Sequence, residues 1–573
     1  MNNFRISIAQ INTTVGDLNL NTDKIISNIE LAKSKKSDLV IFPELSITGY
    51  PPEDLLLRPQ FIEDNINQLE KIISATKKIS TIFGFVDSKS NIYNAAALVT
   101  NKKLQGIYHK MLLPNYGVFD ELRYFKAGQS PTIYNINNIC VGINICEDIW
   151  HPNGPFVKQS EMGAQMIINI NASPFEVGKS EIRESMLINR ARSNDLYIAY
   201  VNLVGGQDEL VFDGSSIVLN PHGEIIARAK KFEEDLLTID LNILTKNNSN
   251  KSSSKNLDFI QDKNTIPKIS ENIKNNIVDN DSLHDLYQAL IIGTKDYVRK
   301  CNFERVIIAI SGGIDSSLVT TIATDALGKE NIYGLFMPSR FNSKDSLTDT
   351  KKLASNLGID LNIISIEETF NHYEKLLKNH VPNWESSLVA ENIQARIRAN
   401  IIMAISNQEK SLILTTGNKS ELAIGYTTIY GDMAGGFSVI KDVYKTIVYK
   451  LAKYRNSISK KNIIPLSIIN KAPSAELREG QTDQDSLPEY SKLDSILNAY
   501  IENDYSINQI INIGHDQDIV EDIIKLVDQN EYKRRQSAPG IKITSKNFGR
   551  DRRMPISNHY SKFVLNNTLK DIK

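Results

Sequence analysis

Three segments in the first half of the chain each place a chemically capable residue where a predicted strand ends. Glu44 lies in IFPELSITGY, Lys110 in YHKMLLPNYGVFDE and Cys146 in GINICEDIW. A thiol is a good nucleophile only as a thiolate, so it needs a base or a nearby positive charge. Glu44 could take the thiol proton, Lys110 could stabilise charge on a carbonyl oxygen, and Cys146 could attack. Because strand ends converge in α/β architectures, these residues predict a nucleophilic site.

A histidine base is the alternative to a glutamate base. His109 and His151 flank the same segments and could pair with Cys146. His109 immediately precedes Lys110, so on a strand the two side chains would point to opposite faces, which favours the glutamate–lysine arrangement. Cys140 and Cys301 have no neighbouring chemistry, and we expect them to be inert core thiols.

A glycine-rich loop in the second half predicts a phosphate site. The segment RVIIAISGGIDSSLVTTIATDALG is typical of a strand, a loop and a helix. Two glycines allow a tight turn that brings N–H groups towards an anion, and the helix directs its positive end to the same place. No Gly-Lys-Ser/Thr follows at the spacing of a Walker A loop. The residues expected to bind ATP are Ser311, Gly312, Gly313, Ile314, Asp315 and Ser316, with Asp315 helping to hold magnesium.

The first half resembles the nitrilase, or carbon–nitrogen hydrolase, family, whose Glu–Lys–Cys triad occurs in similar segments and in this order. LPNYGVFDE, ICEDIW, NASPF and VGGQDELVFDG are nearly identical to segments of the glutamine amidase domain of bacterial glutamine-dependent NAD synthetases. The resemblance implies that Glu44 is the general base, Lys110 the cation at the oxyanion and Cys146 the nucleophile that forms a thioester. It also implies a glutamine-binding set: Tyr116, Glu147, Ser173 and Lys179.

The SGGIDS loop is shared by several ATP-dependent adenylating enzymes, but the segments after it resemble the NAD synthetase domain. These segments are MPSRFNSKDSLTDTKKLASNLG, ENIQARIRAN, LTTGNKSELAIGYTTIYGDMAGGFSVIKDVYKT and KAPSAELREGQTDQDSLPEY. The resemblance implies amidation of deamido-NAD to NAD+ through an adenylate, with ammonia from glutamine, yielding AMP, diphosphate and glutamate. It implies an ATP contact at Thr416 and magnesium ligands at Asp315 and Glu421. The implied deamido-NAD contacts are Asn392, Glu421, Asp432, Lys445 and Lys533.

Short strands alternating with helices would position these residues. The strands expected in the first half are Ile6–Ala9, Leu39–Phe42, Ser80–Phe85, Ala95–Val99, Ile139–Ile145, Met166–Ile170 and Tyr197–Val201, with helices at Asn21–Lys35 and Arg58–Lys78. The second half is expected to have a helix at Asp281–Lys300 and strands at Val306–Ile310, Ile332–Phe336, Asn362–Ile366 and Leu412–Thr416.

These patterns predict an α/β protein with two catalytic domains. Residues 1–244 would form the amidase domain, which by resemblance is a nitrilase-like α-β-β-α sandwich. Residues 281–573 would form the synthetase domain, a Rossmann-like parallel sheet carrying the ATP loop. Residues 245–280 are rich in Asn, Ser and Lys and poor in aromatics, so we expect a polar linker.

Composition and charge further narrow the class of protein to which the chain can belong. The chain has 573 residues, of which 41% are hydrophobic and 23% charged, as in globular proteins of about two to four domains. Its net charge of -1 provides no global field for nucleic acid or anionic membrane. Three cysteines cannot form a disulfide framework, MNNFRISIAQ is not a signal peptide, and no apolar run approaches the roughly 20 residues of a membrane span. We expect a cytoplasmic enzyme acting on small molecules, and the resemblance favours a homo-oligomer.

Two basic runs and one polar segment also have predicted roles. Residues 533–535 and 550–553 lack interleaved aromatic side chains, so we expect one run to meet a substrate phosphate rather than nucleic acid. Ser343–Asp349 is dense in polar residues and could be a lid that shields an adenylate from water.

Two other functions remain open at this stage. The first is a glutamine-dependent adenylating ligase with another acceptor, which a comparison of deamido-NAD with xanthylate would separate. The second is a nucleotide sensor with a degenerate site, although the intact Glu44, Lys110, Cys146 and SGGIDS loop argue against decay. If ammonia passes between two sites, an internal path would protect it from protonation.

Overall fold

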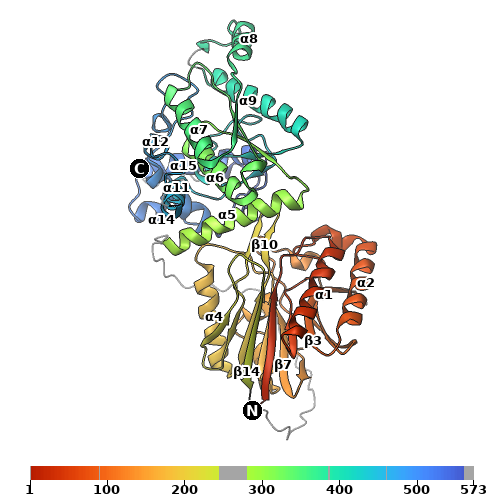
Figure 1. Ribbon diagram of the computed structural model, residues 1–573. Helices are drawn as coiled ribbons and strands as arrows, with labels where there is room; N and C mark the ends of the chain where they lie inside the picture. Colours follow the sequence, from red (N-terminus) through yellow and green to blue (C-terminus); the bar gives the residue numbers. More distant parts are fainter. Residues whose placement is uncertain (1, 89–90, 244–279, 385–386, 460, 561–573) are drawn as a thin grey trace. The chain divides into compact units, whose positions relative to one another are not determined.

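The chain folds into two compact α/β units, Met1–Ile277 and Val278–Lys573. The computed structural model describes residues 2–88, 91–243, 280–384, 387–459 and 461–560, as Figure 1 shows. The predicted linker, 245–280, lies outside the described residues except for its last position. The domain boundaries and the linker therefore stay predictions.

The N-terminal unit contains two six-stranded sheets and a separate hairpin. The first sheet, ordered β14-β1-β2-β3-β4-β5, comprises β1 (Asn2–Gln10), β2 (Leu39–Ile41), β3 (Ser80–Ser88), β4 (Ile92–Thr100), β5 (Lys103–His109) and β14 (Asp235–Ile243). The second sheet, ordered β13-β12-β9-β8-β7-β6, comprises β6 (Ile133–Ile136), β7 (Ile139–Ile145), β8 (Met166–Asn171), β9 (Tyr197–Asn202), β12 (Ile217–Leu219) and β13 (Ile225–Arg228). The hairpin pairs β10 (Val204–Gln207) with β11 (Leu210–Asp213).

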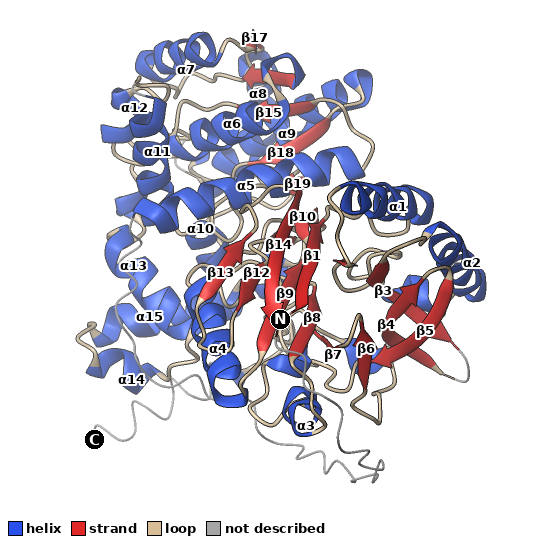
Figure 2. Ribbon diagram, turned by 60° about the horizontal axis from the view of Figure 1, so that its bottom comes forward, coloured by secondary structure: helices blue, strands red, loops and turns tan. Residues whose placement is uncertain are grey.

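Both faces of each sheet are buried in this unit. Alternate residues, such as Ile6 and Ile8 on β1 and Ile143 and Ile145 on β7, form one apolar core between the sheets. On the outer side, α1 (Leu18–Ser34) and α2 (Pro59–Ala75) pack on the first sheet. On the opposite outer side, α3 (Pro155–Glu161) and α4 (Lys179–Asn194) pack on the second sheet (Figure 2). This arrangement is the predicted α-β-β-α sandwich.

The C-terminal unit is built on a five-stranded sheet in which every neighbouring pair is parallel. Its order is β17-β16-β15-β18-β19, formed by β15 (Val306–Ala309), β16 (Ile332–Phe336), β17 (Asp360–Ile363), β18 (Leu412–Thr415) and β19 (Phe437–Ser438). The chain leaves β15 for β16 on one side and returns to β18 on the other. β15 is thus a topological switch point, where ligand sites form at the carboxyl ends of the strands. This is the predicted parallel-sheet fold.

Helices cover this sheet, and further helices form a layer beside it. They are α5 (Asn280–Lys300), α6 (Ile314–Leu327), α7 (Lys344–Leu357), α8 (Glu367–Leu377), α9 (Leu388–Glu409), α10 (Lys419–Ile424), α11 (Lys445–Ser459), α12 (Leu466–Asn470), α13 (Tyr490–Leu497), α14 (Ile507–Asn512), α15 (Gln517–Gln529) and α16 (Glu531–Arg534). Short 3-10 or π turns lie at Glu53–Leu57, Glu121–Arg123, Cys146–Ile149, Lys329–Asn331, Asp483–Asp485 and Asn498–Glu502. Apolar residues of α10, α13, α14 and α15 share one core. Among the described residues, no helix combines the length and apolar character that crossing a membrane requires.

Several sequence predictions need correction. The strand expected at Asn362–Ile366 ends at Ile363, because Ile366 begins the turn that bonds to Pro338 and starts α8. Ser343 is the N-cap of α7, since its hydroxyl accepts the Ser346 N–H, and residues 344–349 begin this helix, so the role of the segment as a lid stays a prediction. Cys301 is exposed rather than buried in the core. The strands β5, β6, β10–β14 and β19 were not predicted.

Gly84 on β3 links this fold to the predicted catalytic glutamate. A Cβ atom at Gly84 would lie 2.1 Å from the Leu45 nitrogen and 2.6 Å from the Glu44 carbonyl carbon. We expect Gly84→Ala to displace the Glu44 backbone and destabilise the N-terminal unit by about 1–3 kcal/mol. Each unit holds one of the two tryptophans, so thermal unfolding of a Trp384→Phe background, followed by Trp150 fluorescence, reports this unit. An unchanged midpoint of thermal unfolding would contradict this, because it would show that β3 accommodates the extra methyl group without loss of stability.

Candidate active sites

The Lys110 side chain is the centre of a buried charge cluster in the N-terminal unit. Its backbone N–H continues the pairing of β5 with β4 by donating to the Asn94 carbonyl, 2.9 Å away. Its Nζ atom donates to Glu44 Oε1 and to Glu121 Oε1, both at 2.8 Å. The exposed fractions of the three side chains are 0% for Lys110, 0% for Glu44 and 5% for Glu121. Burial acts to lower the pKa of Lys110, but the charges of Glu121 and Glu44 raise it well above its ordinary value.

Glu44 is held by more than Lys110. Its Oε1 atom also accepts the Asn94 side-chain N–H at 2.7 Å, and its Oε2 atom accepts the Ala172 backbone N–H at 2.9 Å. Residue 172 directly follows β8 in the second sheet, so this carboxylate bridges the strand ends of both sheets. A carboxylate fixed on both oxygens keeps one orientation towards a reacting thiol.

Cys146 lies at a strained turn directly after β7. It begins the 3-10 turn Cys146–Ile149 with φ of 44°, a left-handed conformation that costs a residue with a Cβ about 1 kcal/mol or more. Burial, followed by the charge of Glu44, raises the pKa of the Cys146 thiol well above its ordinary value, while Lys110 acts in the opposite direction. The resting group is therefore a thiol, and its attack requires a base such as Glu44.

The histidine alternative is not supported by the geometry. His109 Nε2 lies 2.7 Å from Asp87 Oδ2, and its ring stacks on Tyr93 at 4.0 Å. It occupies the face of β5 opposite Lys110, as the alternation along a strand predicted. His151 Nδ1 accepts the Asn153 N–H within its own turn.

The four predicted glutamine-binding residues surround this cluster. The Tyr116 hydroxyl donates to Glu147 at 2.9 Å. Burial raises the pKa of the Glu147 carboxyl, whereas this hydrogen bond and the charges of Lys110 and Lys179 act to lower it. Ser173 is buried directly after Ala172, with its N–H donating to Asn202 at 2.9 Å. Lys179 begins α4, with Nζ 3.3 Å from the Pro174 carbonyl oxygen. Contact with glutamine stays a prediction for all four.

Glu121 also belongs to the cluster, although the sequence did not predict a role for it. It also accepts the Tyr50 hydroxyl at 3.0 Å, and burial raises the pKa of its carboxyl to about 7 against the opposing charge of Lys110. It ends the quoted segment LPNYGVFDE, so its position was visible. Its place opposite Glu44 depends on how the segment after Lys110 folds back through the turn Glu121–Arg123.

The predicted ATP loop follows β15 at the switch point of the C-terminal sheet. Gly312 has φ of 82°, and a Cβ there would lie 2.7 Å from the Ser346 carbonyl oxygen, so glycine is required. Ser316 accepts the Ser311 N–H at 3.2 Å and Ser311 accepts the Gly313 N–H at 3.2 Å, which fixes the turn. α6 begins at Ile314, directing its positive N-terminal end to the loop.

Asp315 and Glu421, the two predicted magnesium ligands, are brought together by Lys445. Lys445 Nζ lies 2.5 Å from Asp315 Oδ2 and 3.0 Å from Glu421 Oε1. Asn418, next to Thr416 at the end of β18, donates to Asp315 at 2.9 Å and accepts the Glu421 N–H at 3.0 Å. Desolvation raises the pKa of Glu421 to about 7 although Lys445 acts to lower it. Within the described chain, no group of three or more His, Cys, Asp or Glu side chains could hold a metal by itself.

Three of the predicted deamido-NAD contacts meet at one loop, residues 425–432. Asn392 accepts the Thr428 hydroxyl at 2.7 Å, and Asp432 accepts the Thr428 N–H at 2.8 Å. Lys533 Nζ donates to the carbonyls of Gly425 and Thr427 at 2.7 and 3.1 Å. Glu421 lies in the first turn of α10 itself, and Lys445, which pairs with it, is the first residue of α11. The five residues therefore lie on or around one short helix.

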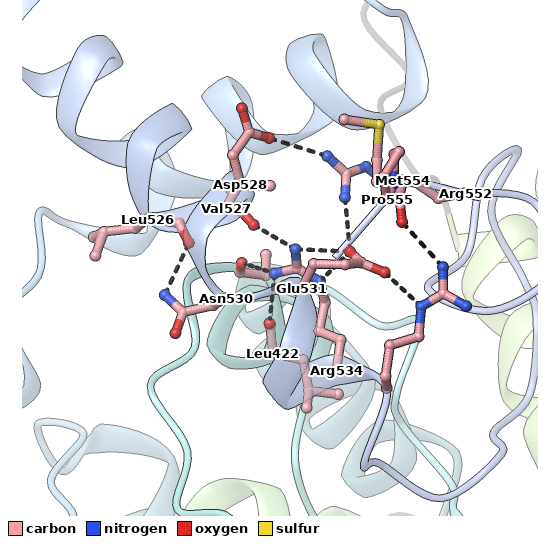
Figure 3. Close-up of polar contacts among 12 residues, drawn as sticks. Leu422, Leu526, Val527, Asp528, Asn530, Glu531, Arg534, Arg552, Met554 and Pro555 are labelled. Carbon is pink, nitrogen blue, oxygen red and sulfur yellow. Dashed lines mark hydrogen bonds and ion pairs between the residues drawn. The ribbon is translucent and has the colours of Figure 1, made fainter. Parts of the chain in front are cut away.

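The arginines of the two basic runs mostly serve the fold. Arg534 is buried and donates to the Leu422 carbonyl and to Glu531, as Figure 3 shows. Arg552 pairs with Asp528 and Glu531 at 3.3 and 3.1 Å. Their guanidinium groups are thus committed to joining α10, α15 and the C-terminal segment. A phosphate contact in the first run stays a prediction for Lys533.

Comparisons with known proteins match both units of the chain to known families. The family model described as carbon–nitrogen hydrolase matches residues 5–245, and the model described as NAD synthase matches residues 286–537. The chain is 46% identical to the glutamine-dependent NAD(+) synthetase of Thermotoga maritima, covering 98% of this chain and 99% of that one. It is 47% identical to the enzyme of the same name from Aquifex aeolicus, covering 98% and 100%. The solved structure of glutamine-dependent NAD+ synthetase from Acinetobacter baumannii in complex with ADP shares 40% identity, a TM-score of 0.73 and coverage of 97% and 99%.

Glu121→Gln tests the second carboxylate beside Lys110. We expect hydrolysis of glutamine to fall about 10- to 100-fold because Lys110 loses one charged partner and shifts. The exposed Glu70→Gln should leave the rate unchanged. Equal rates in both variants would remove Glu121 from the site.

The same variant has a predicted pH signature. The pKa of the Glu121 carboxyl is raised from 4.5 to about 7, so the folded protein retains a proton that the unfolded chain has lost in this range. Wild-type stability therefore falls as pH rises through the window, and Glu121→Gln lacks this loss. The difference in the free energy of unfolding, variant minus wild type, should therefore increase as the pH rises from the ordinary pKa of the glutamate to the raised pKa of Glu121. A constant difference would contradict the shifted carboxyl.

Proposed function

This chain belongs to the family of glutamine-dependent NAD(+) synthetases, and we propose that Cys146 releases ammonia from glutamine while the Ser311–Ser316 loop serves the activation of deamido-NAD by ATP. The protein is a ligase that forms NAD+ with glutamine as the amide donor. The observation that carries the residue assignment is the buried contact of Lys110 with Glu44 beside the strained Cys146 turn.

The amidase half-reaction follows from this geometry. Glu44 takes the Cys146 thiol proton as the sulfur attacks the amide carbon of glutamine, and Lys110 stabilises the oxyanion. Collapse of the tetrahedral intermediate transfers the proton from Glu44 to the leaving nitrogen, releasing ammonia and leaving a thioester. Glu44 then takes a proton from water, whose oxygen attacks the thioester; the C–S bond breaks, glutamate is freed and the proton passes from Glu44 back to the Cys146 sulfur. Tyr116, Glu147, Ser173 and Lys179 would bind the rest of the substrate glutamine.

The synthetase half-reaction would take place at the switch point of the parallel sheet. The nicotinate carboxylate of deamido-NAD attacks the α-phosphorus of ATP, and diphosphate leaves. The positive N-terminal end of α6, which begins directly after the Ser311–Gly313 turn, would stabilise the diphosphate. Ammonia then attacks the acyl-adenylate and AMP leaves. Thr416 would contact ATP, and Asn392, Glu421, Asp432, Lys445 and Lys533 would contact deamido-NAD.

Asp315 and Glu421 would hold magnesium together with the phosphates of ATP. Two carboxylates fit this ion, because magnesium commonly binds one or two carboxylates and completes its shell with phosphate oxygens and water. When bound, the ion would supply positive charge to the leaving diphosphate. The Lys445 ammonium lies between the two carboxylates. When the two carboxylates bind magnesium, the ammonium could contact a phosphate of ATP instead.

Transfer of ammonia between the reactions requires protection from solvent. Ammonia in neutral water is mostly ammonium, which has no lone pair for attack, and the adenylate is sensitive to hydrolysis. An enclosed path between the two reactions fits this requirement and is supported by the chemistry of the paired reactions. A homo-oligomeric assembly is supported by the resemblance to the family alone.

Cys146→Ala separates the two half-reactions. With ATP, magnesium and deamido-NAD, we expect this variant to lose glutamine-driven NAD+ formation by about 1,000-fold or more while ammonium-driven formation continues. Cys140→Ala is the matched control, since it removes a partly buried thiol from the same strand, and it should keep both activities.

Two results would contradict this assignment. Retained glutamine-driven synthesis in Cys146→Ala would remove Cys146 as the nucleophile. Absence of NAD+ formation by wild type with either nitrogen donor, with turnover of another acceptor such as xanthylate, would reassign the acceptor.

Asp315→Asn tests the magnesium assignment. We expect the magnesium concentration for half-maximal ammonium-driven synthesis to rise at least about tenfold, because one charged oxygen ligand is lost. Asp325→Asn is the matched control on the same helix, where Asp325 pairs with Arg455 at 2.6 Å instead of approaching the loop. An unchanged magnesium requirement in Asp315→Asn would exclude this residue as a ligand.

A further inference from the structure

The Asp148 carboxylate collects four hydrogen bonds immediately beside the amidase cluster. Its Oδ1 atom accepts the backbone N–H groups of Met111 and Leu112, at 3.1 and 2.8 Å. Its Oδ2 atom accepts the Ile145 N–H at 3.0 Å and the Tyr108 hydroxyl at 2.9 Å. The side chain is fully buried, so no bulk water competes for these oxygens.

The four donors belong to the two chain segments that carry Lys110 and Cys146. Tyr108, Met111 and Leu112 flank Lys110 at the end of β5, and Ile145 is the residue before Cys146 at the end of β7. β5 lies in the first sheet and β7 in the second, so no ladder of backbone hydrogen bonds joins these strands. A contact outside the sheets must therefore fix the position of the lysine relative to the thiol.

We propose that Asp148 is a positioning residue of the amidase, which sets the Lys110 ammonium against the Cys146 thiol by binding the backbone on both sides. The inference rests on the proposed function of Cys146 and Lys110. Asp148 lies two residues after Cys146 and does not need to touch glutamine to act in this way.

The conformation of Cys146 requires such a support. Its φ of 44° is unfavourable for a residue with a Cβ, and such strain persists only where surrounding contacts enforce it. The bond from Ile145 N–H to Asp148 closes the strained turn on itself. Bonds to an ionised carboxylate are stronger than neutral ones. Burial raises the pKa of Asp148 to about 6, with the Ile145 and Leu112 N–H groups opposing the shift, so the group is ionised at neutral pH.

Asp148→Asn is the sharpest substitution, because it keeps the size of the side chain. The amide has one accepting oxygen, so the backbone donors on one side would face an NH2 group. We expect kcat for glutamine hydrolysis to fall about 100-fold with a smaller change in KM, since misplacement of catalytic groups by about 1 Å has this effect. Ammonium-driven NAD+ formation should continue at the wild-type rate, which shows that the chain is folded and the synthetase site intact.

Alkylation of Cys146 by iodoacetamide separates positioning from simple stability. With Lys110 displaced, the thiolate loses stabilisation, so the pH profile of alkylation should move to higher pH in Asp148→Asn. Tyr108→Phe, which removes one of the four bonds, should show a smaller shift in the same direction. Asp87→Asn is the matched control, because Asp87 contacts His109 beside Lys110 but none of the four donors. It should keep the wild-type profile.

The possible results have distinct meanings. Wild-type kcat and an unchanged alkylation profile in Asp148→Asn would overturn the positioning role. A lowered unfolding temperature with an unchanged profile in the folded fraction would also overturn it, leaving only a structural role. If Cys146→Ala itself retains glutamine hydrolysis, the proposed function fails first, independently of Asp148.

Discussion

A lysine ammonium without solvent-exposed surface stays charged only if negative groups lie against it, because burial of an unpaired charge costs several kcal/mol. Lys110 meets this constraint with two carboxylates at 2.8 Å. Those carboxylates must be fixed in turn, and Asn94, Tyr50 and Ala172 provide their remaining partners. Asn94 lies on β4 of the first sheet and Ala172 directly follows β8 of the second, while Tyr50 lies in the segment between β2 and the turn Glu53–Leu57. The face-to-face packing of the sandwich is thus what allows a charged lysine to lie beside a thiol.

The same constraint is met differently in the C-terminal unit. Lys445 also lies between two carboxylates, Asp315 and Glu421, but these retain an exposed fraction of 17% each. A partly open cluster can exchange partners, so phosphate groups can take the lysine and a cation can take the carboxylates. The buried amidase cluster has no such freedom and is suited to holding a single geometry through a covalent step. Burial therefore distinguishes the proposed site of covalent catalysis from the proposed site of nucleotide chemistry.

Sequence patterns predicted what depends on residue type and local order. Glu44, Lys110, Cys146 and the SGGIDS loop all occur where predicted strands end, and the structure places each at the end of β2, β5, β7 or β15 or just beyond it. Contacts between distant segments could not be predicted in this way. Glu121 and Asp148 are in recognisable segments, yet their partners are set by the packing of two sheets.

Exposure was also difficult to predict from composition. Cys301 is exposed because it follows the last turn of α5, whereas Arg534 is buried because α10, α15 and the C-terminal segment converge on it. By residue type alone, a cysteine is expected to be buried and an arginine exposed. The helical start of α7 was not predicted either, because serine and aspartate favour both turns and helix N-termini.

The central claim is that the thiol beside Lys110 carries the acyl group of glutamine. Mass spectrometry of peptides from enzyme quenched in acid during turnover with glutamine measures this directly. A glutamyl adduct on the peptide containing Cys146, absent without glutamine, is the predicted result. Continued glutamine hydrolysis with an adduct on Cys140 or Cys301, or with no adduct on any cysteine under single-turnover sampling, would contradict it.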